Sequence, residues 1–257
     1  MISKSGLKNI LALKHKKFRT EQELLLIEGF HLCLEALQSD FTVATLLINP
    51  DNLPPQKVNE IIQIARNKQV EIIEIQQYEV NQLADTVNSQ GIFCIVQQKK
   101  YNLTAILNKD NKFIILINEG QDPGNVGTII RTCDWFGIDA VLLSNGTVEL
   151  FNPKVIRSTM GSIFHLPIIE GVDLNMLLPR FKQHHYHIFG TDVNGEYPYH
   201  QINYPVPLVL VVGNENQGID KKLWRYFDKI VKIPSYGKAE SLNMALAAAI
   251  IISRVVN

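Results

Sequence analysis

Three polar segments, each directly after an apolar strand, hold the side chains that could do chemistry in this chain. Arg131 is the next-to-last residue of the first segment, NEGQDPGNVGTIIRT at 118–132, and lies in a predicted helix among largely apolar neighbours. An arginine in that setting either extends its guanidinium to water or binds an anion. Its fixed charge and planar set of donors suit a phosphate, or an oxyanion that develops during a reaction.

The other two segments add a glycine, a carboxylate and a hydroxyl. LVLVVGNENQGI at 208–219 places Gly213 and Glu215 after a continuous apolar strand. Glycine lets a ligand approach the backbone closely, and a carboxylate at the mouth of a buried strand favours a functional role. IVKIPSYGKAESLNMALAAAII at 230–251 brings Ser241 to the start of the last predicted helix. Because open parallel sheets bind ligands at the carboxyl edge of their strands, we expect the three segments to converge there.

Ordinary structural roles compete with the chemical ones. Pro123 and Gly124 are typical turn formers, and Asn125 is expected to cap the helix that carries Arg131. Ser241 could cap the last helix in the same way. Arg131 is harder to explain by a structural role, although its guanidinium could simply extend to water.

Residues 1–98 predict a first α/β domain, because strands alternate with helices and such alternation is typical of a largely parallel sheet. The expected strands are 24–29, 43–49, 70–75 and 91–97, and the expected helices are 31–38, 55–67 and 77–84. Residues 99–111 are polar at both ends and predict a linker with a short helix inside it.

Residues 112–257 predict a second α/β domain. The expected strands are 112–118, 139–144, 164–168, 186–191, 208–213 and 229–233, and the expected helices are 125–136, 153–159, 173–184, 220–226 and 241–255. This order places each polar segment at the carboxyl end of a strand.

Charge is informative only in its distribution. The chain has 257 residues, 46% of them hydrophobic, and a formal net charge of zero. A surface that binds nucleic acid would therefore have to be local. The first 20 residues contain cations and no acidic residue, which indicates either a solvated helix face or an arm that contacts phosphates. The candidates for phosphate contact are Lys14, Lys16, Lys17 and Arg19.

Other familiar signals are absent from the sequence. No GxGxxG follows a strand, so the fingerprint of a dinucleotide-binding oxidoreductase is missing. The three histidines at 184–187 and the three scattered cysteines lack metal-ligand spacing, so no metal is expected. The cysteines are expected to be buried thiols in a reducing compartment. With no signal peptide and no apolar run of ~18 residues, the expected location is the cytoplasm.

Taken together, NEGQDPGNVGTIIRT, LVVGNENQGI and IPSYGKAESLNMALAAAI closely resemble the three signature motifs of the SpoU/TrmH family. These proteins are RNA ribose 2′-O-methyltransferases of the SPOUT class. The motifs occur in the family's order and cover the whole second domain. The first hundred residues resemble the family's ribosomal-protein-like substrate-binding domain through LIEG at 26–29 and QGIF at 90–93.

The resemblance implies an α/β fold with a deep trefoil knot, a homodimer that uses the last helix, and S-adenosylmethionine as cofactor. The cofactor would lie in the knot and be held largely by backbone groups. By motif position, its contacts fall at Gly213, Ile233 and Leu242, with Thr191 as a further candidate.

The resemblance also implies a catalytic set. The family's catalytic arginine falls on Arg131, and its associated polar residues fall on Asn125, Glu215, Ser241 and Asn243. All five are present, which argues against a non-catalytic RNA-binding or ribosome-assembly factor on the same scaffold. Among substrates, the additional first domain favours large-subunit ribosomal RNA, and transfer RNA is the alternative.

Overall fold

The computed structural model describes residues 2–107, 112–214 and 217–257. These residues form two compact units. The first consists of Met1–Lys99 together with Phe151–Phe164, and the second of Lys100–Leu150 together with His165–Asn257. The segment from 151 to 164 therefore clusters with the first hundred residues, although the sequence predicted it to lie in the second domain.

The first unit is built on a four-stranded sheet in the order β1-β4-β2-β3. Its strands are β1 (Leu24–Glu28), β2 (Val43–Ile48), β3 (Glu71–Glu74) and β4 (Ile92–Gln97). Its helices are α1 (Lys4–Ala12), α2 (Lys16–Gln22), α3 (Phe30–Gln38), η1 (Pro50–Asn52), α4 (Pro55–Asn67), α5 (Gln77–Leu83), α8 (Pro153–Thr159) and η2 (Ser162–Phe164).

The expectation of a largely parallel first sheet is wrong. Only β2 and β3 pair in parallel, whereas β4 pairs antiparallel with both β1 and β2. Helices α3 and α4 connect strands that run the same way, as crossover helices do. The reversed strand is β4, which follows α5 and enters the sheet between β1 and β2. Alternation of elements did not reveal this reversal.

The second unit contains a seven-stranded sheet in the order β7-β6-β5-β10-β8-β11-β9, and every neighbouring pair is parallel. Its strands are β5 (Phe113–Ile117), β6 (Ala140–Ser144), β7 (Ile168–Val172), β8 (His187–Thr191), β9 (Tyr197–Pro198), β10 (Leu208–Val212) and β11 (Lys229–Lys232). The parallel sheet predicted for this part is confirmed. Strand β7 begins four residues later than predicted, after Pro167, and the short β9 was not predicted.

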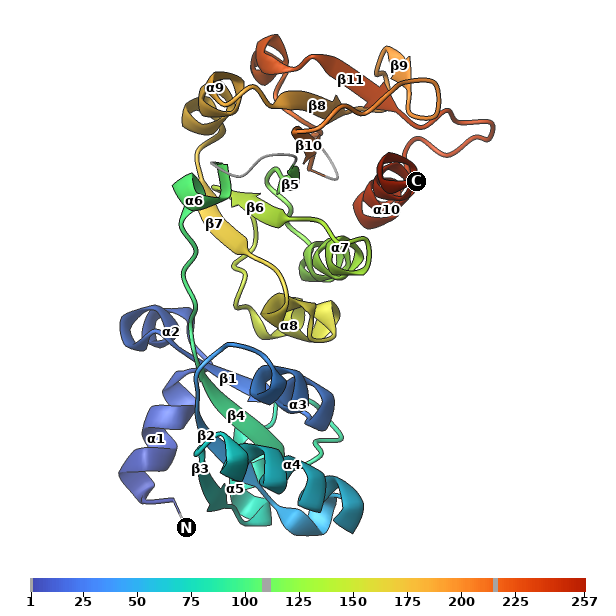
Figure 1. The fold of residues 1–257 in the computed structure, drawn as a ribbon. Coiled ribbons are helices and arrows are strands. Elements are labelled where there is room, and N and C mark those ends of the chain that lie inside the picture. Colours follow the sequence, from blue (N-terminus) through green and yellow to red (C-terminus); the bar gives the residue numbers. More distant parts are fainter. Residues whose placement is uncertain (1, 108–111, 215–216) are drawn as a thin grey trace. The chain divides into compact units, whose positions relative to one another are not determined.

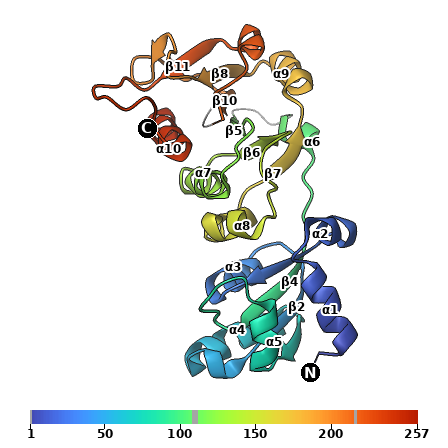
Figure 2. The ribbon, with the colours of Figure 1, turned by 180° about the vertical axis from the view of Figure 1, so that it is seen from behind.

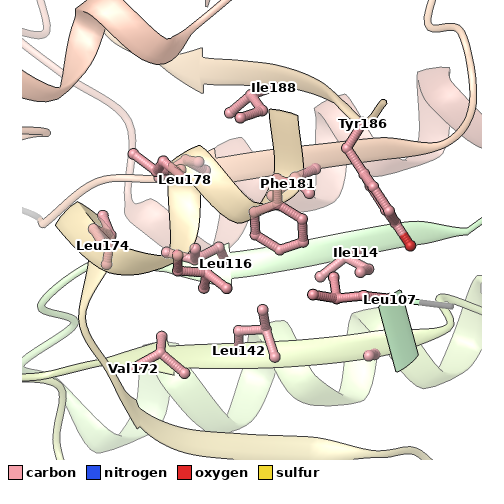
Figure 3. Close-up of a cluster of buried hydrophobic side chains, with 14 of the residues drawn as sticks. Leu107, Ile114, Leu116, Leu142, Val172, Leu174, Leu178, Phe181, Tyr186 and Ile188 are labelled. Atoms are coloured by element: carbon pink, nitrogen blue, oxygen red, sulfur yellow. The ribbon is translucent and has the colours of Figure 1, made fainter. Parts of the chain in front are cut away.

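Helices cover both faces of this sheet. They are α6 (Leu103–Leu107), α7 (Pro123–Trp135), α9 (Leu174–Gln183), η3 (Lys221–Tyr226) and α10 (Met244–Val256). On one face, Leu174, Leu178 and Phe181 of α9 pack on Leu116 and other strand residues in a buried cluster (Figure 3). On the other, α7 and α10 lie side by side, as both ribbon views show (Figures 1 and 2). Strands β5, β6 and β10 are buried along their whole length, which accounts for their unbroken apolar runs.

Two helix starts differ from the expectation. Asp122, not Asn125, caps α7, because the Asp122 side chain accepts a hydrogen bond from the Asn125 N–H at 2.8 Å. Pro123 then occupies the first helical turn, where its missing N–H costs nothing. Asn243, not Ser241, caps α10. In both cases the capping residue leaves Asn125 or Ser241 available for another role.

Three further expectations concern the cysteines, membrane-spanning helices and the trefoil knot. All three cysteines are free and buried, as predicted, and burial raises the pKa of the Cys133 thiol. In the described part of the chain, no helix combines the length and the apolar character needed to cross a bilayer. The trefoil knot implied by the resemblance stays a prediction.

Candidate active site

The three polar segments converge at one edge of the second sheet, as predicted. Strand β10 lies between β5 and β8, and β11 lies beside β8, all in parallel. The register pairs Val212 with Ile117, and Val231 with Thr191, so the strands end nearly level. The loops that follow β5, β10 and β11 are therefore neighbours, and we call them the first, second and third loops.

The second loop is folded on itself and tied to the first. Backbone hydrogen bonds run both ways between Asn214 and Gly218, at 3.2 and 3.0 Å. The Asn214 side-chain amide donates to the Glu119 carbonyl of the first loop at 2.7 Å. Glu119 itself adopts a left-handed backbone conformation, φ 54°, and its N–H donates to Ser144 Oγ at 2.8 Å. Neither Glu119 nor Asn214, which lies between Gly213 and Glu215, was predicted to hold the two loops together.

A side-chain bridge joins the first and third loops. Asn243 Nδ2 donates to Asn125 Oδ1 at 2.9 Å, across 118 residues of chain. The same Asn243 side chain accepts from the N–H groups of Ala245 and Leu246 at 2.9 and 3.3 Å, which caps α10. The Asn243 side chain thus fixes the start of α10 and also holds it against α7. Two of the five expected catalytic residues are therefore in direct contact.

Arg131 and Ser241 are not brought into that contact. Arg131 is exposed on α7, and its guanidinium makes no hydrogen bond or ion pair with any residue in the described ranges. It lies six residues beyond Asn125, or ~9 Å along the helix axis. Ser241 is exposed in the third loop. Glu215 lies outside the described residues. The structure thus leaves the Arg131 guanidinium available to an external anion.

The candidate cofactor residues lie at the carboxyl ends of three adjacent strands. Thr191 ends β8, and its hydroxyl donates to the Val211 carbonyl at 3.2 Å. Gly213 follows β10, and a Cβ built there would lie 2.7 Å from the backbone carbon of Gly218. Glycine is thus required here for the second loop to close on itself, in addition to any ligand approach. Ile233 follows β11 directly.

The third loop offers unpaired backbone groups. Among the described residues, 233–242 take part in no hydrogen bond, through backbone or side chain. A segment of open N–H and C=O groups beside a parallel sheet edge fits a ligand that is held by the main chain. Leu242, at the end of this segment, is exposed and can supply an apolar contact. These residues fit the cofactor that the motifs imply.

The four candidate phosphate-binding residues of the first unit are placed very differently. Arg19 is only 5% exposed, and its guanidinium donates to the carbonyls of Leu13 and Lys14 at 3.0 and 2.8 Å. Lys14 donates to the Ala84 carbonyl and pairs with Asp85 at 3.1 Å. Arg19 therefore has a structural role instead of the expected phosphate contact, because its burial keeps its charge from RNA.

Lys16 and Lys17 are the exposed pair. The Lys17 ammonium lies 3.9 Å from the Glu21 carboxylate, one helical turn away. Both side chains are exposed to solvent, so this ion pair is weak. The Lys17 ammonium also lies 5.9 Å from the centroid of the exposed Phe18 ring. Within the described residues, no group of His, Cys, Asp or Glu side chains is placed to hold a metal ion.

The Asn125–Asn243 bridge makes a prediction with a built-in control. Asn243→Ser retains a good cap but cannot reach Asn125, whereas Asn125→Ala removes the bridge from the other side. We expect each variant to lose roughly 2- to 12-fold of the methyl-transfer activity that the motifs imply, equivalent to about 0.5–1.5 kcal/mol, which is what one exposed hydrogen bond contributes. Each melting temperature should change little.

Single-turnover rates of the two variants and of the double variant would measure the coupling. If the bridge is the shared cause, the double variant should be no slower than either single one. Losses that multiply would show that the two residues act separately.

Two family models match the chain. The model of the SpoU rRNA Methylase family matches residues 112–253. The model of the MRM3-like substrate binding domain matches residues 4–94. Together they cover both parts of the chain that the sequence analysis distinguished.

Individual relatives agree with the family models. The 23S rRNA (guanosine(2553)-2'-O)-methyltransferase RlmP of Bacillus subtilis is 35% identical, over 93% of this chain and 91% of its own. A crystal structure of an rRNA methyltransferase from Sinorhizobium meliloti with AdoMet bound is 28% identical, with a TM-score of 0.84, over 99% of this chain and 96% of that one. The SpoU methyltransferase AviRb from Streptomyces viridochromogenes, 24% identical, has the same fold, with a TM-score of 0.88 over 99% of this chain and 97% of its own.

Motifs, loop geometry and relatives agree. The chain is therefore a member of the SpoU family of RNA ribose 2′-O-methyltransferases, enzymes that use S-adenosylmethionine.

Proposed function

We propose that this protein methylates a ribose 2′-hydroxyl in large-subunit ribosomal RNA. The observation that carries the choice of RNA is the 35% identity, over nearly the whole chain, to an enzyme named for 23S rRNA. A staphylococcal relative named as a tRNA/rRNA methyltransferase is 28% identical over 91% of this chain. Transfer RNA is therefore the alternative substrate.

The chemistry needs alignment more than activation of the methyl group. When bound, S-adenosylmethionine supplies a methyl already activated by its sulfonium. The protein must bring the ribose oxygen into line with that methyl, and such alignment can contribute ~7–11 kcal/mol in favourable cases. Gly213, Ile233, Leu242 and Thr191 are the residues we assign to holding the cofactor, mainly through their backbone.

Arg131 is the group we assign to the reacting nucleotide. Arginine stays protonated in proteins, so it is poorly suited to accept the 2′-hydroxyl proton. It is well suited to bind the phosphate beside the target ribose and to stabilise the developing alkoxide. Asn125, Glu215, Ser241 and Asn243 complete the proposed site by positioning Arg131 and the ribose. The exposure of the guanidinium, and its lack of a partner among the described residues, support this assignment.

We further propose that the two domains and the linker have separate roles. Residues 1–98 would bind the substrate RNA, 99–111 would link the domains, and 112–257 would carry out methyl transfer. The match of residues 4–94 to a substrate-binding domain supports the first assignment. We place the protein in the cytoplasm, which three free, buried cysteines support.

RNA contact by α2 gives a direct prediction. Lys16→Ala with Lys17→Ala should weaken RNA binding and lower the slope of log affinity against log salt, by about 0.7–0.9 for each lost phosphate contact. Cofactor affinity should not change. Binding isotherms at several salt concentrations would measure the slope. An unchanged slope would mean that these lysines are only a solvated face.

A homodimer through α10 is also part of the proposal. Leu246 and Ile250 are exposed apolar side chains about one helical turn apart on α10, the helix that packs on α7. Trp135, 84% exposed at the end of α7, adds a large apolar side chain on that helix. Exposed apolar side chains grouped in this way are typical of subunit contacts. Sedimentation equilibrium should give about twice the 29.1 kDa mass of one chain.

The activity can be tested with labelled cofactor. Methyl-tritiated S-adenosylmethionine is incubated with the protein and with ribosomal or transfer RNA from cells that lack it. We expect label in large-subunit ribosomal RNA, at one alkali-resistant dinucleotide, as a 2′-O-methyl group requires. Label only in transfer RNA would establish the alternative. The assay is repeated with ribosomal particles in place of naked ribosomal RNA. If neither ribosomal RNA, naked or in particles, nor transfer RNA is labelled, methyl transfer to these RNAs is refuted.

A further inference from the structure

The third loop carries an aromatic side chain that nothing in the fold explains. Tyr236 is 93% exposed, whereas tyrosine normally buries most of its ring. Among the described residues, it makes no hydrogen bond, ring contact or ion pair. Its backbone neighbours in the loop are equally open, since a Cβ built on Gly237 would have no atom within 4 Å. The Tyr236 ring is therefore exposed to solvent and does not contribute to the packing of its loop.

The two ends of this segment are fixed. At one end, the Tyr199 N–H donates to the Lys232 carbonyl at 2.9 Å, beside the β9–β11 pairing. At the other end, Asn243 caps α10 and bridges to Asn125. Tyr236 thus belongs to a loop that begins at the proposed cofactor residues and ends at the proposed catalytic ones. Lys238, two residues further on, is exposed and has no ion pair with any described residue.

We propose that Tyr236 stacks on an unpaired base of the substrate RNA close to the methylated ribose, with Lys238 against a neighbouring phosphate. Proteins that read single-stranded RNA stack unpaired bases on aromatic side chains. A ribose whose 2′-hydroxyl must reach a methyl donor needs its nucleotide held in one orientation, and a stacked base does this. The proposal rests on the proposed function and names the residue that orients the RNA.

The composition of the loop favours RNA over a second protein chain as the occupant. Tyr236 is surrounded in sequence by Ser235, Gly237, Lys238 and Glu240, all exposed. The cores of protein interfaces are apolar and depleted in lysine and glutamate. The exposed apolar side chains of α10 have that character, and the Tyr236 loop does not. Stacking on a base needs only the ring faces, which are open here.

A substitution series separates stacking from mere apolar contact. Tyr236→Phe keeps the ring, Tyr236→Leu keeps only apolar area, and Tyr236→Ala removes both. With bulk ribosomal RNA from cells that lack the protein, we expect the alanine variant to raise KM for RNA roughly 5- to 150-fold, the range that stacking on one base provides. The phenylalanine variant should stay near wild type, and the leucine variant should resemble alanine. Met176→Ala removes a 70% exposed apolar side chain from α9 in the second unit and is the matched control.

Two further measurements make the outcome decisive. The affinity for S-adenosylmethionine, measured by calorimetry, and the mass by sedimentation should be the same in all variants. A leucine variant as active as phenylalanine, an alanine variant with normal KM, or a change of cofactor affinity or mass would each overturn stacking. If the wild-type protein itself transferred no methyl to any RNA, the proposed function would have failed, and the KM comparison would not arise.

Discussion

Arg131→Lys should lose most methyl transfer while binding the cofactor as well as the wild type. Lysine keeps the positive charge but lacks the planar set of donors that can grip a phosphate at two points. Removal of one well-placed donor from a developing oxyanion typically lowers kcat by ~100- to 1,000-fold, and we expect a loss of that size. Because the guanidinium contacts no described residue, its replacement should not alter the fold.

Three measurements on this variant separate the possibilities. Single-turnover transfer gives the chemical rate, calorimetry gives cofactor affinity, and the melting temperature reports the fold. Arg225→Lys, at an exposed arginine of η3 in the second unit, is the control for arginine replacement in general. Near-normal turnover in Arg131→Lys would remove the bidentate contact from the mechanism. A large loss of cofactor affinity would instead assign Arg131 to the cofactor.

The convergence of the three polar segments could be predicted from the sequence because the central strands of the second sheet are buried on both faces. Continuous apolar runs such as 113–117 and 208–212 can hardly be anything but interior strands, and their order with helices makes them parallel. Once the strands are parallel, the polar segments after them must meet at one edge. That step needs no knowledge of side-chain positions.

Side-chain partnerships were much harder to predict. Asp122 and Asn125 are both good caps, and only the backbone geometry decides that Asp122 accepts from the Asn125 N–H and so frees the Asn125 side chain for Asn243. Arg19 and Lys16 look alike in a basic segment, yet one is buried and the other exposed. Such choices depend on which face of a short helix meets the core, and a seven-residue helix gives too little periodicity to show it.

In the first unit, the direction of strand β4 could not be predicted from the sequence. The run 91–97 has the same apolar character as its neighbours, and the element before it is a helix, as in a parallel crossover. The connection through the short α5 nevertheless lets β4 enter reversed at the centre of the sheet. Burial alone does not encode direction, because both orientations bury the same side chains.

Gly213→Ala should lower the affinity for S-adenosylmethionine strongly, because the position has no room for a side chain. In Gly213→Ala, the new methyl group would lie 2.7 Å from the Gly218 backbone carbon and 2.9 Å from the Ile219 backbone nitrogen. Backbone atoms cannot swing aside as a side chain can, so the second loop must open. Overpacking of this kind costs about 1–3 kcal/mol, and cofactor binding would have to supply that energy to close the loop again. We expect the dissociation constant for S-adenosylmethionine to rise roughly 5- to 150-fold.

A matched glycine tests whether the effect is steric. Gly237→Ala lies in the third loop, has no atom within 4 Å of the added carbon and has no left-handed backbone conformation, so its cofactor affinity should stay at the wild-type value. Calorimetric titration of both variants with S-adenosylmethionine and with S-adenosylhomocysteine gives the comparison. The substitution disturbs the loop and not the contacts of the sulfonium group. In Gly213→Ala, the affinities for the two ligands should therefore fall by the same factor. Normal affinity in that variant would mean that closure of the second loop is not needed to hold the cofactor, and the site would then have to rely on the third loop alone.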